Sequence, residues 1–228
     1  MIVVILFRMI QMQSSILTTQ LPELEVNVFE AILSRRSVRS YTAQQADQQT
    51  VHILLEAAVR APTSLHQEPC AFIVIQNQQL LQRLSDLAKS ASLAEASRMG
   101  HVKDTFTEPD ASIFYNANTL IIIGSYAAGQ FVAADCWLAA ENLILTACSM
   151  GLGSCIVGTA LPVLNVPEIK AEFGIPAEYS AIAPIIIGYP SAETLPVSRK
   201  EPVVLSIMEF NGPKGSLSAV PSSVEPGF

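Results

Sequence analysis

The chain has 228 residues; half are apolar, 14% are charged, and the net charge at neutral pH is −7. Nucleic acids select broadly basic surfaces, so an acidic chain is not expected to bind them. No apolar stretch approaches the roughly 18 residues of a membrane-spanning helix, so no membrane partner is expected either. The length suits one large domain or two small ones.

Residues 1–25 are expected to be an N-terminal extension of a domain that spans 26–210. Residues 211–228 are rich in Gly, Pro and Ser and are predicted to be extended or mobile. The four cysteines form neither a disulfide framework nor a cluster with zinc spacing. A cytoplasmic protein without a bound metal is therefore expected.

Helices and a few strands are predicted in chain order. Asn27 and Glu30 form a capping-box pattern at the start of a first helix, and Asp47 caps a second that ends before Pro62. An apolar strand over 70–76 precedes an amphipathic helix over 78–92. Residues 91–112 are polar and weakly patterned, which suits a mobile helix or a lid.

The second half contains the most distinctive helix. A strand over 118–126 precedes a helix over 131–150, whose polar groups are so few that it must be central or lie in a dimer interface. Gly151 ends it, and a short helix over 167–174 and a strand over 179–190 follow. Because strands and helices do not alternate strictly, an α+β fold is favoured.

The stretch "SRRSVRSY", residues 34–41, gathers three of the chain's 13 lysines and arginines within five positions. Cations at a helix end, where they favour the helix dipole, account for one or two of these arginines. Three arginines with a serine suit a phosphate monoester better, since it carries nearly two negative charges and several acceptor oxygens. The residues alone leave both interpretations open.

The stretch "GLGSCIVG", residues 151–158, is rich in glycine, as many ligand-binding loops are, but the spacing of its glycines matches neither of two known motifs. The third glycine comes two positions too late for a dinucleotide fingerprint, and no lysine follows it as in a phosphate-binding loop. A helix cap explains Gly151 but neither Gly153 nor Gly158. Glycines there would let a backbone approach a flat ligand closely.

The loop "APTSLHQEP", residues 61–69, is either a plain helix-to-strand connection or a binding loop dense in hydrogen-bonding groups. No Ser/His/Asp arrangement or pair of catalytic carboxylates stands out, and Cys155 is interpreted as a packing residue. A site without catalytic side chains is typical of an enzyme that uses a cofactor for its chemistry.

Four segments, in family order and spacing, resemble the nitroreductase family of FMN-dependent oxidoreductases: "RRSVRSY", "APTSLHQEP", the stretch 139–158, and "IIIGYP" followed by "SRKEPVV". The resemblance implies an α+β fold with a mostly antiparallel central sheet flanked by helices, in an intertwined homodimer. It implies FMN bound at the subunit interface, and NADH or NADPH as electron donor. Hydride would pass through flavin N5, in ping-pong fashion, to nitroaromatic or quinone-type acceptors.

The same resemblance assigns cofactor-binding residues and no catalytic side chain. Arg35, Arg36, Ser37 and Arg39 would contact the phosphate, ribityl chain or ring edge, and Arg199 would return to the phosphate. The partner subunit would supply Pro62, Thr63, Ser64 and His66. The backbone of Ile156, Val157 and Gly158 would face the flavin ring.

The chain departs from the family pattern at three positions that affect substrate choice and flavin tuning. His66 stands where asparagine is usual, Glu68 where glutamine is usual, and Cys70 where tryptophan is frequent. Two alternatives stay open: a flavin enzyme of this fold that acts on a dedicated substrate, and a flavin-binding protein without turnover.

Overall fold

A computed structural model describes residues 26–99, 112–209 and 218–219. The chain divides into two units, Met1–Thr194 and Leu195–Phe228. The predicted extension over 1–25 lies outside the described residues, and so does the predicted boundary at 210/211. The domain limits at these positions therefore stay predictions.

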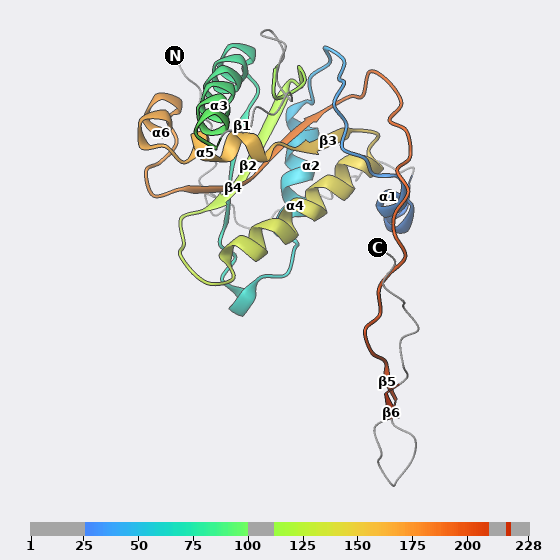
Figure 1. Ribbon diagram of the computed structural model, residues 1–228. Coiled ribbons are helices and arrows are strands. Elements are labelled where there is room, and N and C mark those ends of the chain that lie inside the picture. The colour runs from blue at the N-terminus through green and yellow to red at the C-terminus, as the bar shows by residue number, and fades with distance from the viewer. Residues whose placement is uncertain (1–25, 100–111, 210–217, 220–228) are drawn as a thin grey trace, which may run out of the picture. The chain divides into compact units, whose positions relative to one another are not determined.

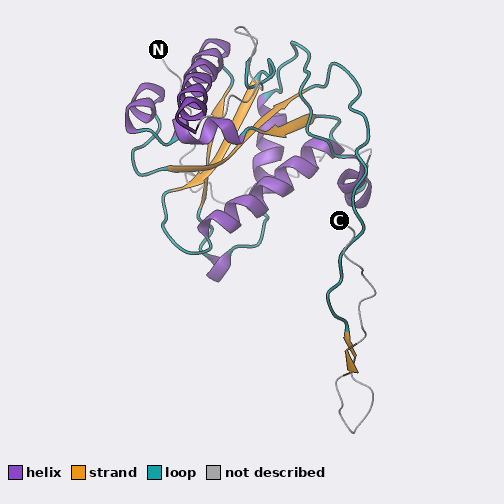
Figure 2. Cartoon of the chain, viewed as in Figure 1, coloured by secondary structure: helices purple, strands orange, loops and turns teal. Residues whose placement is uncertain are grey.

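The first unit contains six α-helices and four strands among its described residues (Figures 1 and 2). The helices are α1 (Val28–Ser34), α2 (Gln48–Val59), α3 (Gln78–Met99), α4 (Val132–Ser149), α5 (Leu161–Leu164) and α6 (Pro167–Phe173). The strands are β1 (Cys70–Ile75), β2 (Thr119–Ser125), β3 (Gly153–Ile156) and β4 (Ser180–Gly188). In the second unit, β5 (Met208–Glu209) pairs with β6 (Ser218–Ala219).

The four strands of the first unit form one antiparallel sheet in the order β1-β2-β4-β3. Helices α2 and α4 cover one face, while α3, α5 and α6 lie on the other (Figure 1). Alternate residues of β2 enter the two cores. Leu120 and Ile122 lie in the core beneath α3, α5 and α6, whereas Ile121 and Ile123 lie in the core beneath α2 and α4. A strand buried on both faces reads as a continuous apolar run, as 118–126 does. The predicted α+β class is confirmed.

The predicted helix ends rest on local hydrogen bonds. The Asn27 side chain accepts from the backbone N–H of Glu30, whose carboxylate accepts from the N–H of Asn27, so the capping box is complete. The Asp47 carboxylate accepts from the N–H of Thr50 at the start of α2. Gly151 follows α4 with a φ of +73°, the left-handed conformation that a C′ glycine adopts at little cost.

Helices α3 and α1 each have a feature that concerns the predicted site. Helix α3 continues to Met99, so the first part of the predicted lid over 91–112 is helical, while 100–111 lie outside the described residues. The apolar side chains of α1 do not form a buried face: Phe29 is 67% exposed and Leu33 60%, and of this helix only Ala31 is buried. Within the described ranges, no helix is long and apolar enough to cross a membrane.

Candidate cofactor-binding site

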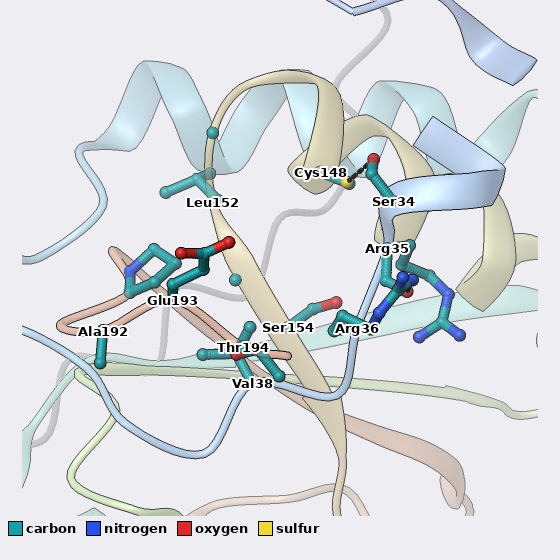
Figure 3. A pocket seen from close by; sticks show the side chains of 13 residues that line it. Ser34, Arg35, Arg36, Val38, Cys148, Leu152, Ser154, Ala192, Glu193 and Thr194 are labelled. Atoms are coloured by element: carbon teal, nitrogen blue, oxygen red, sulfur yellow. Dashed lines mark hydrogen bonds between the residues drawn. The ribbon is translucent and has the colours of Figure 1, made fainter. Parts of the chain in front are cut away.

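A cavity of about 240 Å³ opens where α1 ends beside the turn between α4 and β3. Three segments line it: Ser34, Arg35, Arg36 and Val38; Cys148, Gly151, Leu152, Gly153 and Ser154; and Pro190, Ala192, Glu193 and Thr194. Figure 3 shows the arginine side chains on one side of the cavity and Glu193 on the opposite side. The first predicted motif and the glycine turn, distant in sequence, thus border one cavity.

The two arginines of this cavity have different surroundings. The Nη1 atom of Arg36 donates to the carbonyl oxygens of Leu33 and Arg35, both at 2.8 Å, so this side chain turns back and caps the end of α1. Its Nε atom is buried and has no hydrogen-bond partner among the described residues. The Arg35 side chain has no hydrogen bond or ion pair within the described chain, so its charge is available to a ligand.

The neighbouring residues of the motif run along the sheet edge. Ser37 forms an isolated parallel bridge with Ser154, and the N–H of Val38 donates to the carbonyl oxygen of Ser154 at 2.9 Å. Arg39 is exposed and its guanidinium carbon lies 5.8 Å from the ring centroid of Tyr115, a cation–π arrangement. This edge therefore carries three guanidinium groups, of which two line the cavity.

Gly153 permits the close contact between the motif and β3. A Cβ atom on Gly153 would lie 2.8 Å from the Cβ of Val38, a distance that real contacts essentially never show. The sequence left this glycine unexplained, and the structure assigns it to backbone packing. Gly158 differs, because, apart from its own chain neighbours, no atom of the described residues lies within 4 Å of the position of its Cβ. The backbone at Gly158 is thus open to a flat ligand.

The other residues predicted to face the ring are only partly free. Ile156 is exposed, whereas the N–H of Val157 already donates to the carbonyl oxygen of Pro184 at 2.9 Å. Burial raises the pKa of the Cys155 thiol, although the positive charge of Arg39 opposes this. A thiol that stays protonated at neutral pH agrees with a packing role.

The loop with Pro62, Thr63, Ser64 and His66 lies at the other end of α4. The carboxylate of Asp135, in the first turn of this helix, accepts from the backbone N–H of Ser64 at 3.2 Å. Thirteen residues separate Asp135 from Cys148 of the cavity, which corresponds to about 20 Å of helix. One chain therefore does not bring this loop to the arginine cavity.

The backbone of this loop is held in an uncommon conformation. Leu65, His66 and Glu68 have φ values of 55°, 52° and 44°, which cost non-glycine residues energy. The Thr63 hydroxyl accepts from the N–H of Glu68 at 3.3 Å, and Asp135 supports the start of the turn. Asp135 is one of the few polar residues of this apolar helix, and the sequence alone indicated no role for it.

Two further residues of the cavity carried no sequence signal. Glu193 places a carboxylate opposite the arginines, and Cys148 contacts the hydroxyl of Ser34 at 3.5 Å (Figure 3). Arg199 belongs to the second unit and is exposed, so its predicted contact with the phosphate stays a prediction.

The sequence profile of the Nitroreductase family matches residues 32–189. This chain belongs to the nitroreductase family. A nitroreductase from Bacteroides fragilis, solved with bound FMN, is 28% identical, with a TM-score of 0.63 over 78% of this chain and 95% of that one. An FMN-dependent nitroreductase from Clostridium difficile is 26% identical, with a TM-score of 0.60 over 78% of this chain and 98% of that one.

A Methanothermobacter thermautotrophicus protein with a provisional NADH dehydrogenase/NAD(P)H nitroreductase name is 29% identical over 167 residues. The aligned region covers 73% of this chain and 79% of that relative. Membership in the nitroreductase family makes the chain an oxidoreductase of the nitroreductase-type α+β fold.

Proposed function

We propose that this nitroreductase-family chain binds FMN and uses NADH or NADPH to reduce nitroaromatic or quinone-type acceptors. The observation that carries the proposal is the arginine cavity. Beside a glycine turn it offers the guanidinium of Arg35, which has no hydrogen bond or ion pair among the described residues, next to that of Arg36. The Bacteroides fragilis nitroreductase was solved with bound FMN, and the Methanothermobacter relative carries the name of an NAD(P)H nitroreductase.

The chemistry of the donors fits the phosphate of FMN. A phosphate monoester is an acceptor-only dianion, and guanidinium groups bind it with charge-assisted hydrogen bonds. The Nε of Arg36 is a buried donor without a hydrogen-bond partner among the described residues. Ser37 and Arg39 extend the polar edge, and Arg199 would add a further cation from the second unit.

The flavin ring would lie against the backbone around Gly158. The absence of any atom near its Cβ position leaves room there, and the backbone of Ile156 and Val157 leads to it from β3. When bound, FMN supplies hydride acceptance at N5 from the nicotinamide and delivery to an acceptor that then takes the same place, a ping-pong cycle. The chain itself would hold the phosphate and position the ring.

The loop residues would serve the cavity of a second copy. Pro62, Thr63, Ser64 and His66 lie about 20 Å of helix from their own arginine cavity, so we infer that they contact the FMN of the partner. Two exposed apolar side chains, Phe29 on α1 and Leu138 on α4, suit burial in such an interface. A homodimer with two sites follows from this arrangement.

The first experiment identifies the flavin and the turnover. The purified protein should be yellow, release FMN on denaturation, and oxidise NADH or NADPH faster when a quinone or nitroaromatic is added. Release of FAD, or failure to bind added FMN, would contradict the proposed cofactor. Bound FMN without NAD(P)H consumption would favour the flavin-binding protein without turnover, and a panel of acceptors addresses a dedicated substrate.

The second experiment tests the shared site. Arg35→Ala removes a cavity cation, and Ser64→Leu adds bulk to the distant loop, so either homodimer should bind FMN poorly. In a mixed dimer one site carries both changes and the other carries neither, so about half of the sites should bind FMN normally. Light scattering verifies the dimer mass. Mixed dimers that bind no better than either parent would show that one chain builds each site.

A further inference from the structure

Two of the four cysteines are in direct contact although 66 residues separate them in sequence. Cys70 is the first residue of β1, Cys136 lies in the second turn of α4, and their sulfur atoms are 3.7 Å apart. Cys70 also stands at the position where the family frequently has tryptophan. The pair thus joins the sheet to α4, immediately after the loop over 61–69.

The two thiols differ in access. Cys136 is fully buried, and its sulfur also lies 3.7 Å from the carbonyl oxygen of Gly124. Cys70 is partly exposed and follows the exposed residues of the loop. Buried cysteines usually act as small apolar residues. A partly exposed thiol against a buried one has the arrangement of a reactive cysteine with its resolving partner.

The other two cysteines have different neighbours. The Cys148 sulfur contacts the Ser34 hydroxyl and the carbonyl oxygen of Ala31, while the Cys155 sulfur contacts the carbonyl oxygen of Ile156. Neither of them lies in hydrogen-bond contact with another sulfur. These two cysteines therefore provide internal controls for chemistry at the pair.

We propose that Cys70 and Cys136 are a redox-active pair that forms a reversible disulfide when the protein meets a peroxide. The thiolate of Cys70 attacks one oxygen of hydrogen peroxide, which forms the sulfenic acid and releases hydroxide. The Cys136 thiol then attacks the sulfenic sulfur, the S–S bond forms, and water leaves. The two sulfurs lose two electrons in all, and the peroxide gains them.

The electrostatics of the pair agree with these roles. Contact with Cys136 lowers the pKa of Cys70, and this effect exceeds the opposing influence of burial and of the nearby Asp135 carboxylate. The contact with Cys70, followed by burial, raises the pKa of Cys136. Cys70 is thus the thiol that ionises first and attacks the peroxide.

The disulfide would tie the start of β1 to the N-terminal part of α4, where Asp135 holds the loop at Ser64. The inference does not depend on FMN, since it rests on the contact and exposure of the two thiols. Bonding requires the sulfurs to approach from 3.7 Å to the roughly 2.0 Å of a disulfide.

The test uses the full chain, first reduced and then treated with hydrogen peroxide. Free thiols are alkylated and the digest is analysed by mass spectrometry. We expect a peptide that links Cys70 to Cys136, a mass loss of about 2 Da per chain, and full reversal by dithiothreitol. A non-reducing gel should show single chains, because the bond is internal. Bonds between chains, or a Cys70 that stays reduced or proceeds to sulfinic acid, would overturn the proposal.

Two sets of variants complete the test. Cys148→Ser and Cys155→Ser keep the pair and should form the same link as the unmodified chain. Cys136→Ser removes the resolving thiol, so the sulfenic acid on Cys70 should persist and react with dimedone. If Cys136→Ser does not fold, the linked peptide in the other two variants still decides the matter. Loss of the link in either of those variants would contradict the assigned pairing.

Discussion

The two ends of α4 carry two different kinds of binding surface. At the C-terminal end, the two arginines that follow α1 and the glycines of the turn line a cavity whose groups all come from one chain. At the N-terminal end, an exposed loop in a costly backbone conformation is held by Asp135 and does not line the arginine cavity. The comparison teaches that one chain places its arginine cavity and this polar loop about 20 Å apart along α4.

Arg35→Ala should produce the largest effect, at the cavity end. Loss of one charge-assisted hydrogen bond, worth about 1.5–3 kcal/mol, should weaken FMN binding about 10- to 150-fold. Flavin fluorescence titration of apo-protein measures this. As a solvated helix-end cation, Arg35 would instead affect only stability, by up to about 1 kcal/mol.

Arg83→Ala is the matched control for this change. Arg83 lies on α3 in an exposed ion pair with Glu172, 3.1 Å between Nε and Oε1, far in sequence from every segment of the cavity. Its loss should leave FMN affinity unchanged and alter stability by about 1 kcal/mol or less. Equal FMN affinity in the Arg35 and Arg83 variants would remove the cavity from the proposed site.

Asp135→Ala tests the opposite end of the helix. The change leaves the Ser64 N–H without its acceptor and should cost about 1–3 kcal/mol of stability. The loop over 61–69 should also be cleaved faster in limited proteolysis. Asp135→Asn keeps an acceptor oxygen and should recover most of the loss. If the alanine variant resists proteolysis as well as the unmodified chain, Asp135 does not hold the loop.

Asp47→Ala tests the stability contribution of a residue that lies at neither end of α4. It removes the cap of α2 and should cost about 1 kcal/mol of unfolding free energy without a change in FMN affinity. The hydrogen bond from Thr50 lowers the pKa of Asp47 in the folded chain. The contribution of Asp47 to the free energy of unfolding should therefore be present above its pKa in the unfolded chain, near 4. It should be lost as the pH falls through the lower pKa of the folded chain. Urea unfolding of both proteins across this range checks the sign.

Glu193→Gln should have the smallest effect and the opposite sign. The carboxylate shares the cavity with the arginines and would repel a bound phosphate, but it is exposed. Its removal should gain about 0.2–1 kcal/mol, or up to about fivefold in FMN affinity at low salt. The gain should shrink as salt is added. A weaker affinity would mean that Glu193 contacts the ligand favourably.

Several local features followed from the sequence alone. The capping box of Asn27 and Glu30, the Asp47 cap and the left-handed Gly151 each depend on groups within a few residues, so their chemistry is legible without the fold. The four family segments likewise predicted the α+β class, and the cluster of arginines marked the place of the cavity.

Only the tertiary structure decided how these pieces are used. It turned Arg36 toward the end of α1 and left Arg35 without a partner among the described residues. It also assigned Gly153 to contact with Val38 and brought Cys70 to Cys136. These outcomes depend on packing between segments that lie far apart in sequence, and periodicity and capping rules carry no information about such contacts. The separation of the loop from the cavity has the same origin, since the length of α4 sets it.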